Sequence, residues 1–190
     1  MKRIYLILIP IIIFANNHKI SAEGDGYGVN NGGNSGDTVT VTNATDFRKY
    51  VTSSTPYIVK VSGTIDLGGN VNISGNKTIT GVDTLSSIKG CISLDRIKNV
   101  IIKNLNISNL NISSDGISLY YTTNVLITHC TVFDCTDGSI DITRESDFVT
   151  VSYCKFYYKE VENHKFPNLI GAGDNDTTDR GKLHVTFHHN

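Results

Sequence analysis

Short strand-like segments recur along this chain at a nearly constant spacing. Val100, Val125 and Val149 occupy equivalent places in three of them, 25 and 24 residues apart. The apolar segments shortly before them are Ile92-Ser93-Leu94, Ile117-Ser118-Leu119 and Ile140-Asp141-Ile142. A fixed period in the twenties, built from strands without a helical pattern, predicts a solenoid. The regular leucines of leucine-rich repeats are missing, so we expect an all-β chain wound as a parallel β-helix, with polar turns outside.

The start of the domain carries the one helical signal. Residues 23–37 are rich in Gly and Asn, which indicates an irregular lead-in. Thr38 to Thr42 alternates as a strand. Asp46 to Val51 then has the pattern of a short helix, with Asn43 or Thr45 as its N-cap.

The repeat register also places the cysteines. Leu105, Cys130 and Cys154 fall at equivalent inward positions, so Cys130 and Cys154 are expected in adjacent coils about one strand spacing apart. That distance permits a disulfide, and the four cysteines suit an oxidising compartment. Two free, stacked thiols fit the register equally well, and the sequence leaves both alternatives open. His129 falls at the bend after its strand, where we expect a structural role.

The N-terminus has the composition of a secretory signal peptide. Lys2 and Arg3 precede an apolar run from Ile4 to Phe14, which is short for a membrane span. Cleavage after Ala22 would leave one domain at residues 23–190, so we expect a secreted, extracellular protein without a membrane partner. Loss of the leader changes the formal charge from −1 to −4. A mildly acidic chain argues against nucleic-acid binding, which needs a basic surface.

A stretch from Thr136 to Arg144 carries the candidate chemistry. Asp137 and Asp141 lie four residues apart with Gly138 between them, and Asp115 lies in the preceding copy of the coil. In a straight strand the two carboxylates would be about 13 Å apart, too far for one small ion. Spacing alone favours a turn aspartate and a solvated strand aspartate. A bend at Gly138 would instead bring both carboxylates to a common edge.

Several blocks, in a fixed order, carry a resemblance to a known family. They are Val61 to Ile65, Asn76 to Gly81, Asn99 to Leu105, Asp137 to Ser152, Leu169 to Gly171 and Asp179 to Asn190. With these blocks the chain resembles the extracellular pectate lyases of polysaccharide lyase family 1, from about Gly26 to Asn190. The resemblance implies a right-handed parallel β-helix, a monomer, which binds Ca²⁺ and cleaves de-esterified polygalacturonate (pectate) by β-elimination.

The resemblance also implies roles for individual residues. Asp115, Asp137 and Asp141 match the calcium ligands of the family, and Lys182 matches the lysine that binds a substrate carboxylate. Ca²⁺ prefers six to eight hard oxygens, so three aspartates leave room for water and a uronate carboxylate. Metal and lysine charges would stabilise the negative charge that builds as the C5 proton leaves.

Two departures from the family pattern matter. The segment Val125 to His129 lacks the family's Trp and Asp, so altered packing or surface contacts are expected there. The family continues into an Arg-x-Pro-Arg-x-Arg motif whose first arginine is the general base, and this motif would lie beyond Asn190. We therefore expect no catalytic base in this chain, and C-terminal coils of the β-helix to be missing.

Three functional interpretations follow. The favoured one is a fragment of a secreted, Ca²⁺-dependent pectate lyase. The alternative is a non-catalytic β-helix that binds pectate or another carbohydrate. A polygalacturonase-like hydrolase would share the fold, but the Lys182 block does not suit it.

Overall fold

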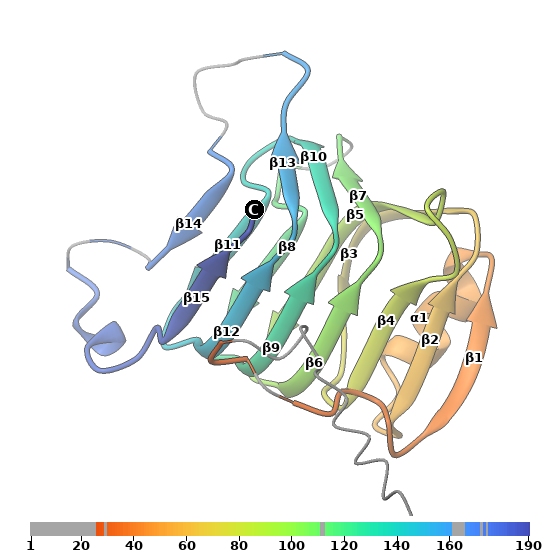
Figure 1. The fold of residues 1–190 in the computed structure, drawn as a ribbon, viewed down its shortest axis with the longest axis horizontal. Coiled ribbons are helices and arrows are strands. Elements are labelled where there is room, and N and C mark those ends of the chain that lie inside the picture. The colour runs from red at the N-terminus through yellow and green to blue at the C-terminus, as the bar shows by residue number, and fades with distance from the viewer. Residues whose placement is uncertain (1–25, 29, 111–112, 161–165, 172, 174) are drawn as a thin grey trace, which may run out of the picture.

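The computed structural model describes residues 26–28, 30–110, 113–160, 166–171, 173 and 175–190. The expected signal peptide at residues 1–22 lies outside this part. Parallel strands wind into a β-helix of about five turns, which confirms the predicted fold class. Figure 1 shows the coils stacked side by side, with the first strand at one end and the last at the other.

Each coil contributes one strand to a seven-stranded parallel sheet, here sheet A. Its strands in spatial order are β1 (Asp37–Val41), β2 (Tyr57–Val61), β4 (Lys77–Gly81), β6 (Lys98–Lys103), β9 (Thr123–Thr128), β12 (Asp147–Ser152) and β15 (Val185–His188).

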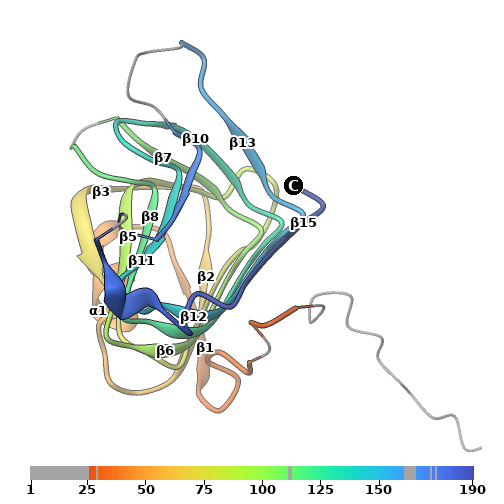
Figure 2. The same cartoon turned by 90° about the vertical axis from the view of Figure 1, so that its left-hand side faces the viewer.

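The other two sides of the coil belong to one bent sheet. Side B holds β7 (Asn106–Asn109), β10 (Thr131–Cys135) and β13 (Lys155–Tyr157), and side C holds β8 (Ile117–Tyr120), β11 (Ile140–Thr143) and β14 (Asn168–Ile170). Strands β3 (Thr64–Asn72) and β5 (Ser87–Asp95) run through both sides, because the first half of β5 pairs with β7 and its second half with β8. Viewed along the stack, the three sides enclose the core (Figure 2).

The core consists of like side chains stacked from coil to coil. Val100, Val125 and Val149 pair in register on sheet A, and all three are fully buried. Ile92, Ile117 and Ile140 do the same on side C. The repeat read from the sequence is therefore the repeat of the core. Burial of these side chains stabilises each coil only when the next coil is present, as in other solenoids.

Helix α1 (Ala44–Val51) packs at the N-terminal end of the stack, against β2 and β3. Of the two expected N-caps, Asn43 and Thr45, the structure has Asn43, whose side-chain oxygen accepts a 2.9 Å hydrogen bond from the N–H of Asp46. The helix buries Phe47 and Val51. No helix among the described residues is long and apolar enough to span a membrane.

The irregular lead-in crosses sheet A (Figure 1). The N–H of Gly28 donates to Thr150 Oγ1 at 2.7 Å on β12, and the N–H of Gly33 donates to Thr78 Oγ1 at 3.0 Å on β4. A Cβ atom at Gly33 would lie 1.8 Å from the carbonyl oxygen of Tyr57. Glycine is therefore needed here because the lead-in backbone touches the sheet backbone directly.

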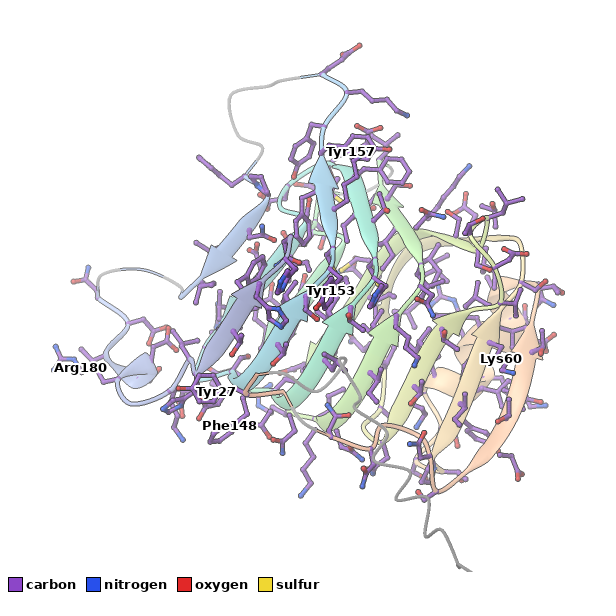
Figure 3. The ribbon with its side chains drawn as sticks, viewed as in Figure 1. Tyr27, Lys60, Phe148, Tyr153, Tyr157 and Arg180 are labelled. Carbon is purple, nitrogen blue, oxygen red and sulfur yellow. The ribbon has the colours of Figure 1, made fainter. Side chains whose placement is uncertain are left out.

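The bends after β6, β9, β12 and β15 are each made by a residue with left-handed backbone. His129 has a φ of 53°, its Nδ1 lies 2.9 Å from Thr128 Oγ1, and its ring stacks on Tyr153 at 5.0 Å. Tyr153, labelled in Figure 3, stacks in turn on His189 at 4.8 Å. The contacts of His129 are thus those of a corner residue that joins successive coils, which agrees with the structural role expected for it.

Cys130 and Cys154 lie in adjacent coils, directly before the paired residues Thr131 and Lys155. Both are buried, and both are free thiols in the structure. Of the two alternatives that the sequence left open, the structure thus has the stacked thiols and no disulfide. A hydrogen bond with Cys154, together with burial, raises the pKa of the Cys130 thiol.

Candidate functional site

Two of the three expected metal ligands meet around Gly138. Asp115 lies just before β8, and its Oδ1 accepts a 3.0 Å hydrogen bond from the N–H of Gly138 in the next coil. A Cβ atom at Gly138 would lie 2.6 Å from Asp141 Oδ1 and 3.0 Å from Asp115 Oδ1. The two carboxylates therefore face the same point on the surface of side C, and only a residue without a side chain leaves this point open.

The parallel register explains why these residues meet. Asp141 pairs with Ser118, and Ile140 pairs with Ile117. Because side chains alternate along a strand, the buried isoleucines point into the core while Ser118 and Asp141 point outward. Ser118 Oγ donates a 2.6 Å hydrogen bond to Asp115 Oδ2, which fixes the Asp115 carboxylate over the same face.

Asp137 is the exposed member of the set. It lies in the turn before β11, and its carbonyl oxygen accepts a 2.9 Å hydrogen bond from Tyr158 Oη. Its charge acts on both Asp115 and Asp141. The structure thus brings Asp115 and Asp141 together, with Asp137 as a nearby negative charge. The chain bends at Asp137 and at Ser139, on either side of Gly138, while Gly138 itself has no left-handed φ and contributes space for the carboxylates.

The pKa values of Asp115 and Asp141 are both raised. Burial, followed by the charges of Asp115 and Asp137, raises the pKa of Asp141 to about 7. Burial also raises the pKa of Asp115, although the hydrogen bonds from Ser118 and Gly138 act in the opposite direction. A carboxylate held near others in a partly buried place is destabilised until a cation or a proton neutralises it.

The donor chemistry of this cluster fits a hard cation. Asp141 accepts no hydrogen bond from the described residues, so both of its oxygens remain available. Within the part of the chain that the structure describes, however, no three His, Cys, Asp or Glu side chains are arranged so that they alone hold a metal ion. Asp115, Asp137 and Asp141 would therefore need water or substrate oxygens to complete a calcium shell.

Lys182 lies in the segment between the short helix η2 (Thr177–Asp179) and β15, and it is exposed. This segment runs beside the turn that follows β11, because the N–H of Leu183 donates to the carbonyl oxygen of Ser146 at 3.2 Å. The structure therefore places Lys182 near the far end of the strand that carries Asp141. The connection between β14 and β15 is prominent in Figure 1, and Arg180 marks it in Figure 3.

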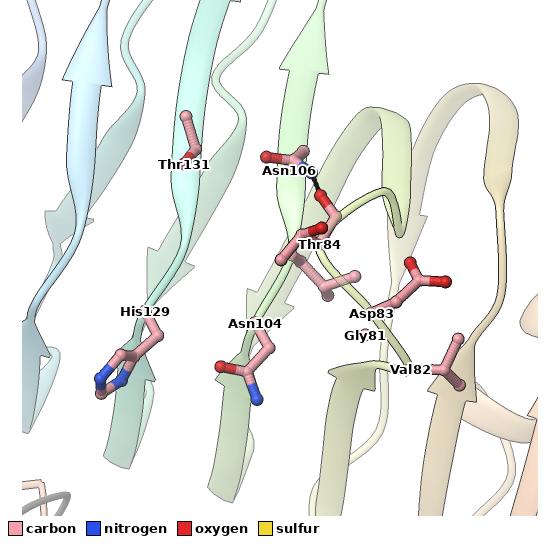
Figure 4. A pocket seen from close by; sticks show the side chains of 9 residues that line it. Gly81, Val82, Asp83, Thr84, Asn104, Asn106, His129 and Thr131 are labelled. Atoms are coloured by element: carbon pink, nitrogen blue, oxygen red, sulfur yellow. Dashed lines mark hydrogen bonds between the residues drawn. The ribbon is translucent and has the colours of Figure 1, made fainter.

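A separate hollow of about 360 Å³ lies at another corner of the β-helix (Figure 4). It is lined by Asn104 and His129 at the bends after sheet A, by Asn106 and Thr131 on side B, and by the loop from Gly81 to Thr84. These residues stand at the beginnings of β7 and β10, whereas Asp115 and Asp137 follow the ends of the same strands. This hollow is therefore not part of the aspartate cluster.

The neighbours of the cluster on side C were not among the site residues predicted from the sequence. Tyr120 pairs with Thr143, two residues beyond the pair formed by Ser118 and Asp141, so it emerges on the same outward face. The alternation of core and surface residues in Ile117-Ser118-Leu119-Tyr120 would have indicated this position.

Comparison with known proteins agrees with the fold. A family profile described as pectate lyase matches residues 1–190. A pectate lyase of Emericella nidulans is 36% identical over 169 residues, which cover 84% of this chain and 50% of that protein. A pectate trisaccharide-lyase of Thermotoga maritima is 30% identical over 172 residues, or 84% of this chain and 46% of the relative.

Solved structures of pectate lyases have a similar fold. A thermostable pectate lyase superposes with a TM-score of 0.78 at 23% identity, over 90% of this chain and 65% of that one. A pectate lyase from Bacillus sp. N165 in complex with trigalacturonate superposes with a TM-score of 0.73 at 24% identity, over 86% of this chain and 59% of that one. The chain spans about half the length of the curated relatives it matches. With the profile match over its whole length, the chain belongs to the pectate lyase family.

Proposed function

We propose that the protein is a secreted, Ca²⁺-dependent pectate lyase that cleaves de-esterified polygalacturonate by β-elimination. The observation that carries this proposal is the pair of carboxylates, Asp115 and Asp141, which face one point beside Gly138 on the outer wall of a pectate-lyase β-helix. Relatives described as pectate lyases, and a solved pectate lyase in complex with trigalacturonate, support the substrate class.

In this mechanism Asp115, Asp137 and Asp141 would hold the cation, and Lys182 would bind a uronate carboxylate. When bound, Ca²⁺ would neutralise that carboxylate and so favour loss of the C5 proton. The elimination then expels the oxygen at C4 and leaves an unsaturated sugar end. No water is added, so the pair of carboxylates that flanks the bond in glycoside hydrolases is not required. We assign the base that removes the C5 proton to no residue of this chain.

The test is an assay on polygalacturonate that follows the absorbance of the unsaturated product, with Ca²⁺ and with a chelator. We expect product from a full-length form of the protein that includes the family's arginine motif, and we expect this product to disappear in chelator. We also expect Asp141→Asn to weaken Ca²⁺ binding, whereas Asp37→Asn, an exposed carboxylate on β1, should not. Chelator-resistant activity, or product without a double bond, would count against the proposal. Pectate binding without turnover would favour the alternative, a non-catalytic pectate-binding β-helix.

Secretion is tested separately. We expect that the mature protein begins at Glu23, which N-terminal sequencing of the exported product would show. Retention of residues 1–22 in the exported protein would contradict this part of the proposal.

A further inference from the structure

A second hollow, of about 230 Å³, adjoins the aspartate cluster on side C. It is lined by Asp95, Arg96, Tyr120, Tyr121 and Arg144. These residues stand where β5, β8 and β11 end, in three successive coils of the stack. We refer to this set as the arginine hollow. Its two guanidinium groups and two phenol rings distinguish it from the acidic surface beside it.

The two arginines differ in their partners. Arg96 forms an ion pair with Asp95, in which Nη1 donates to both carboxylate oxygens at 2.8 Å, and it also lies over the ring of Tyr121. Arg144 lies over the ring of Tyr120, 5.8 Å from its centroid. Its side chain forms no ion pair and donates no hydrogen bond among the described residues. The hollow thus carries an excess positive charge, and a guanidinium fork is free to take a planar anion.

The arginine hollow lies one step along the strands from the aspartates. Tyr120 follows Ser118 by two residues on the same outward face, which corresponds to about 7 Å along a strand. Ser118 in turn is bonded to Asp115 and paired with Asp141. The pKa of Tyr120 is raised, first by burial and then by the charges of Asp115 and Asp141, while a hydrogen bond with Ser118 acts in the opposite direction. A ligand chain lying on the aspartates therefore reaches Arg144 without leaving side C.

We propose that the arginine hollow binds the carboxylate of a second uronate residue of the same polysaccharide chain, with Arg144 as its direct ligand. This inference rests on the proposed function and adds a specificity to it. A free carboxylate offers two oxygens to the guanidinium fork, whereas a methyl ester carries no charge and cannot accept a charge-assisted pair. The site therefore selects stretches in which neighbouring uronate residues are both de-esterified.

The test measures the affinity of the 190-residue protein for trigalacturonate by calorimetry at saturating Ca²⁺. Arg144→Gln is expected to lower this affinity about tenfold, the range expected for loss of a charge-assisted hydrogen bond. The matched control is Lys60→Gln, which removes one positive charge from an exposed place on β2, far along the stack (Figure 3). This control should bind like the unmutated protein.

A second measurement separates this site from the metal site. Replacing trigalacturonate by its methyl ester should weaken binding to the unmutated protein more than binding to Arg144→Gln. Calcium affinity should be the same in both proteins. Arg96→Gln is a second variant, because it leaves the Asp95 carboxylate unpaired beside the anion and should also weaken trigalacturonate binding.

The outcomes distinguish the two proposals. Unchanged trigalacturonate affinity in Arg144→Gln and Arg96→Gln, with normal binding by the unmutated protein, would overturn the arginine hollow and leave the proposed function standing. No binding of trigalacturonate by the unmutated protein would overturn both. If Arg144→Gln does not fold, as judged from its thermal transition, the result for Arg96→Gln decides.

Discussion

Asp147 holds His184 by two hydrogen bonds to one carboxylate oxygen. The backbone N–H of His184 donates to Asp147 Oδ1 at 2.8 Å, and its ring Nδ1 lies 2.7 Å from the same atom. On the other side of Lys182, the carboxylate of Asp179 accepts a hydrogen bond from the N–H of Glu145. The segment that carries Lys182 is therefore bound at one end to the turn between β11 and β12 and at the other end to the first residue of β12.

We expect Asp147→Ala to destabilise the protein and to weaken pectate binding. The Asp147 side chain is 7% exposed and also accepts a 3.1 Å hydrogen bond from the N–H of Phe148. Loss of this acceptor should lower the free energy of unfolding by about 1–3 kcal/mol, which urea denaturation would measure. Asp37→Ala, at an exposed place, should change it by less than about 0.5 kcal/mol. Equal stability of the two variants would contradict a stabilising role for the hydrogen bonds that Asp147 accepts.

The contacts between Asp147 and His184 also predict that the stability of the fold depends on pH in the acid range. Burial would raise the pKa of Asp147, but the hydrogen bonds from His184 and Phe148 outweigh it and lower that pKa. A carboxyl whose folded pKa lies below its unfolded value of about 3.9 stabilises the fold above that pH, and this stabilisation is lost as the pH falls through the folded pKa. The stability difference between the unmutated protein and Asp147→Asn should therefore shrink below about pH 4. A difference that stays constant down to pH 2 would contradict this.

The architecture was predictable because it repeats. The spacing of Val100, Val125 and Val149 is set by the length of a coil, and stacking of identical positions is the interaction that holds a solenoid together. The N-cap at Asn43 was predictable for a similar reason, since capping depends on local sequence. The fold and these elements were thus confirmed, whereas the calcium and substrate roles of Asp115, Asp137, Asp141 and Lys182 stay predictions.

The contacts that depend on non-repeating segments were not predictable. The pairing of Asp147 with His184 spans 37 residues and depends on the path of the connection between β14 and β15, which has no counterpart in the earlier coils. Lys77 is a second case. A lysine in a strand is expected to point outward, yet Lys77 pairs with Val100 and takes the inward position of that valine.

Asp141→Asn is expected to stabilise the metal-free protein at neutral and alkaline pH. The pKa of Asp141 is raised to about 7, above its unfolded value of about 3.9. The folded state therefore holds a proton that the unfolded state releases, and stability falls as the pH rises between these values. An amide is neutral throughout, so its advantage should appear above about pH 4 and be largest above pH 7.

This prediction is checked by thermal unfolding in chelator at several pH values. We expect Asp141→Asn to raise the unfolding midpoint by about 2–4 °C at pH 8, which corresponds to about 1 kcal/mol in a chain of this size. At pH 3 the midpoints of the two proteins should be the same. Asp37→Asn is the control and should leave the midpoint unchanged at both. A lower midpoint for Asp141→Asn at pH 8 would mean that the carboxylate is stabilised by a contact other than a metal.

We expect the stability of the fold to depend strongly on Lys77, even when a side chain of similar volume replaces it. Its side chain is fully buried, and its Nζ donates to the carbonyl oxygens of Ser53, Thr55 and Gly75 at 2.8, 2.9 and 2.9 Å. Ser53 and Thr55 follow α1 in its coil, whereas Gly75 lies just before β4, so Lys77 links the helix-bearing segment to the next coil of the stack. Met at this position fills a similar volume but donates no hydrogen bond, and it leaves the three carbonyls without this partner.

We therefore expect Lys77→Met to lower the free energy of unfolding by about 3 kcal/mol, the scale for buried groups left unsatisfied. Lys98→Met is the matched control, because Lys98 is exposed at the start of the neighbouring strand β6 and should change stability by less than about 0.5 kcal/mol. Urea denaturation of the three proteins measures both effects. Similar losses for Lys77→Met and Lys98→Met would show that an inward lysine contributes no more here than a solvated one, and that apolar stacking alone holds the first coils together.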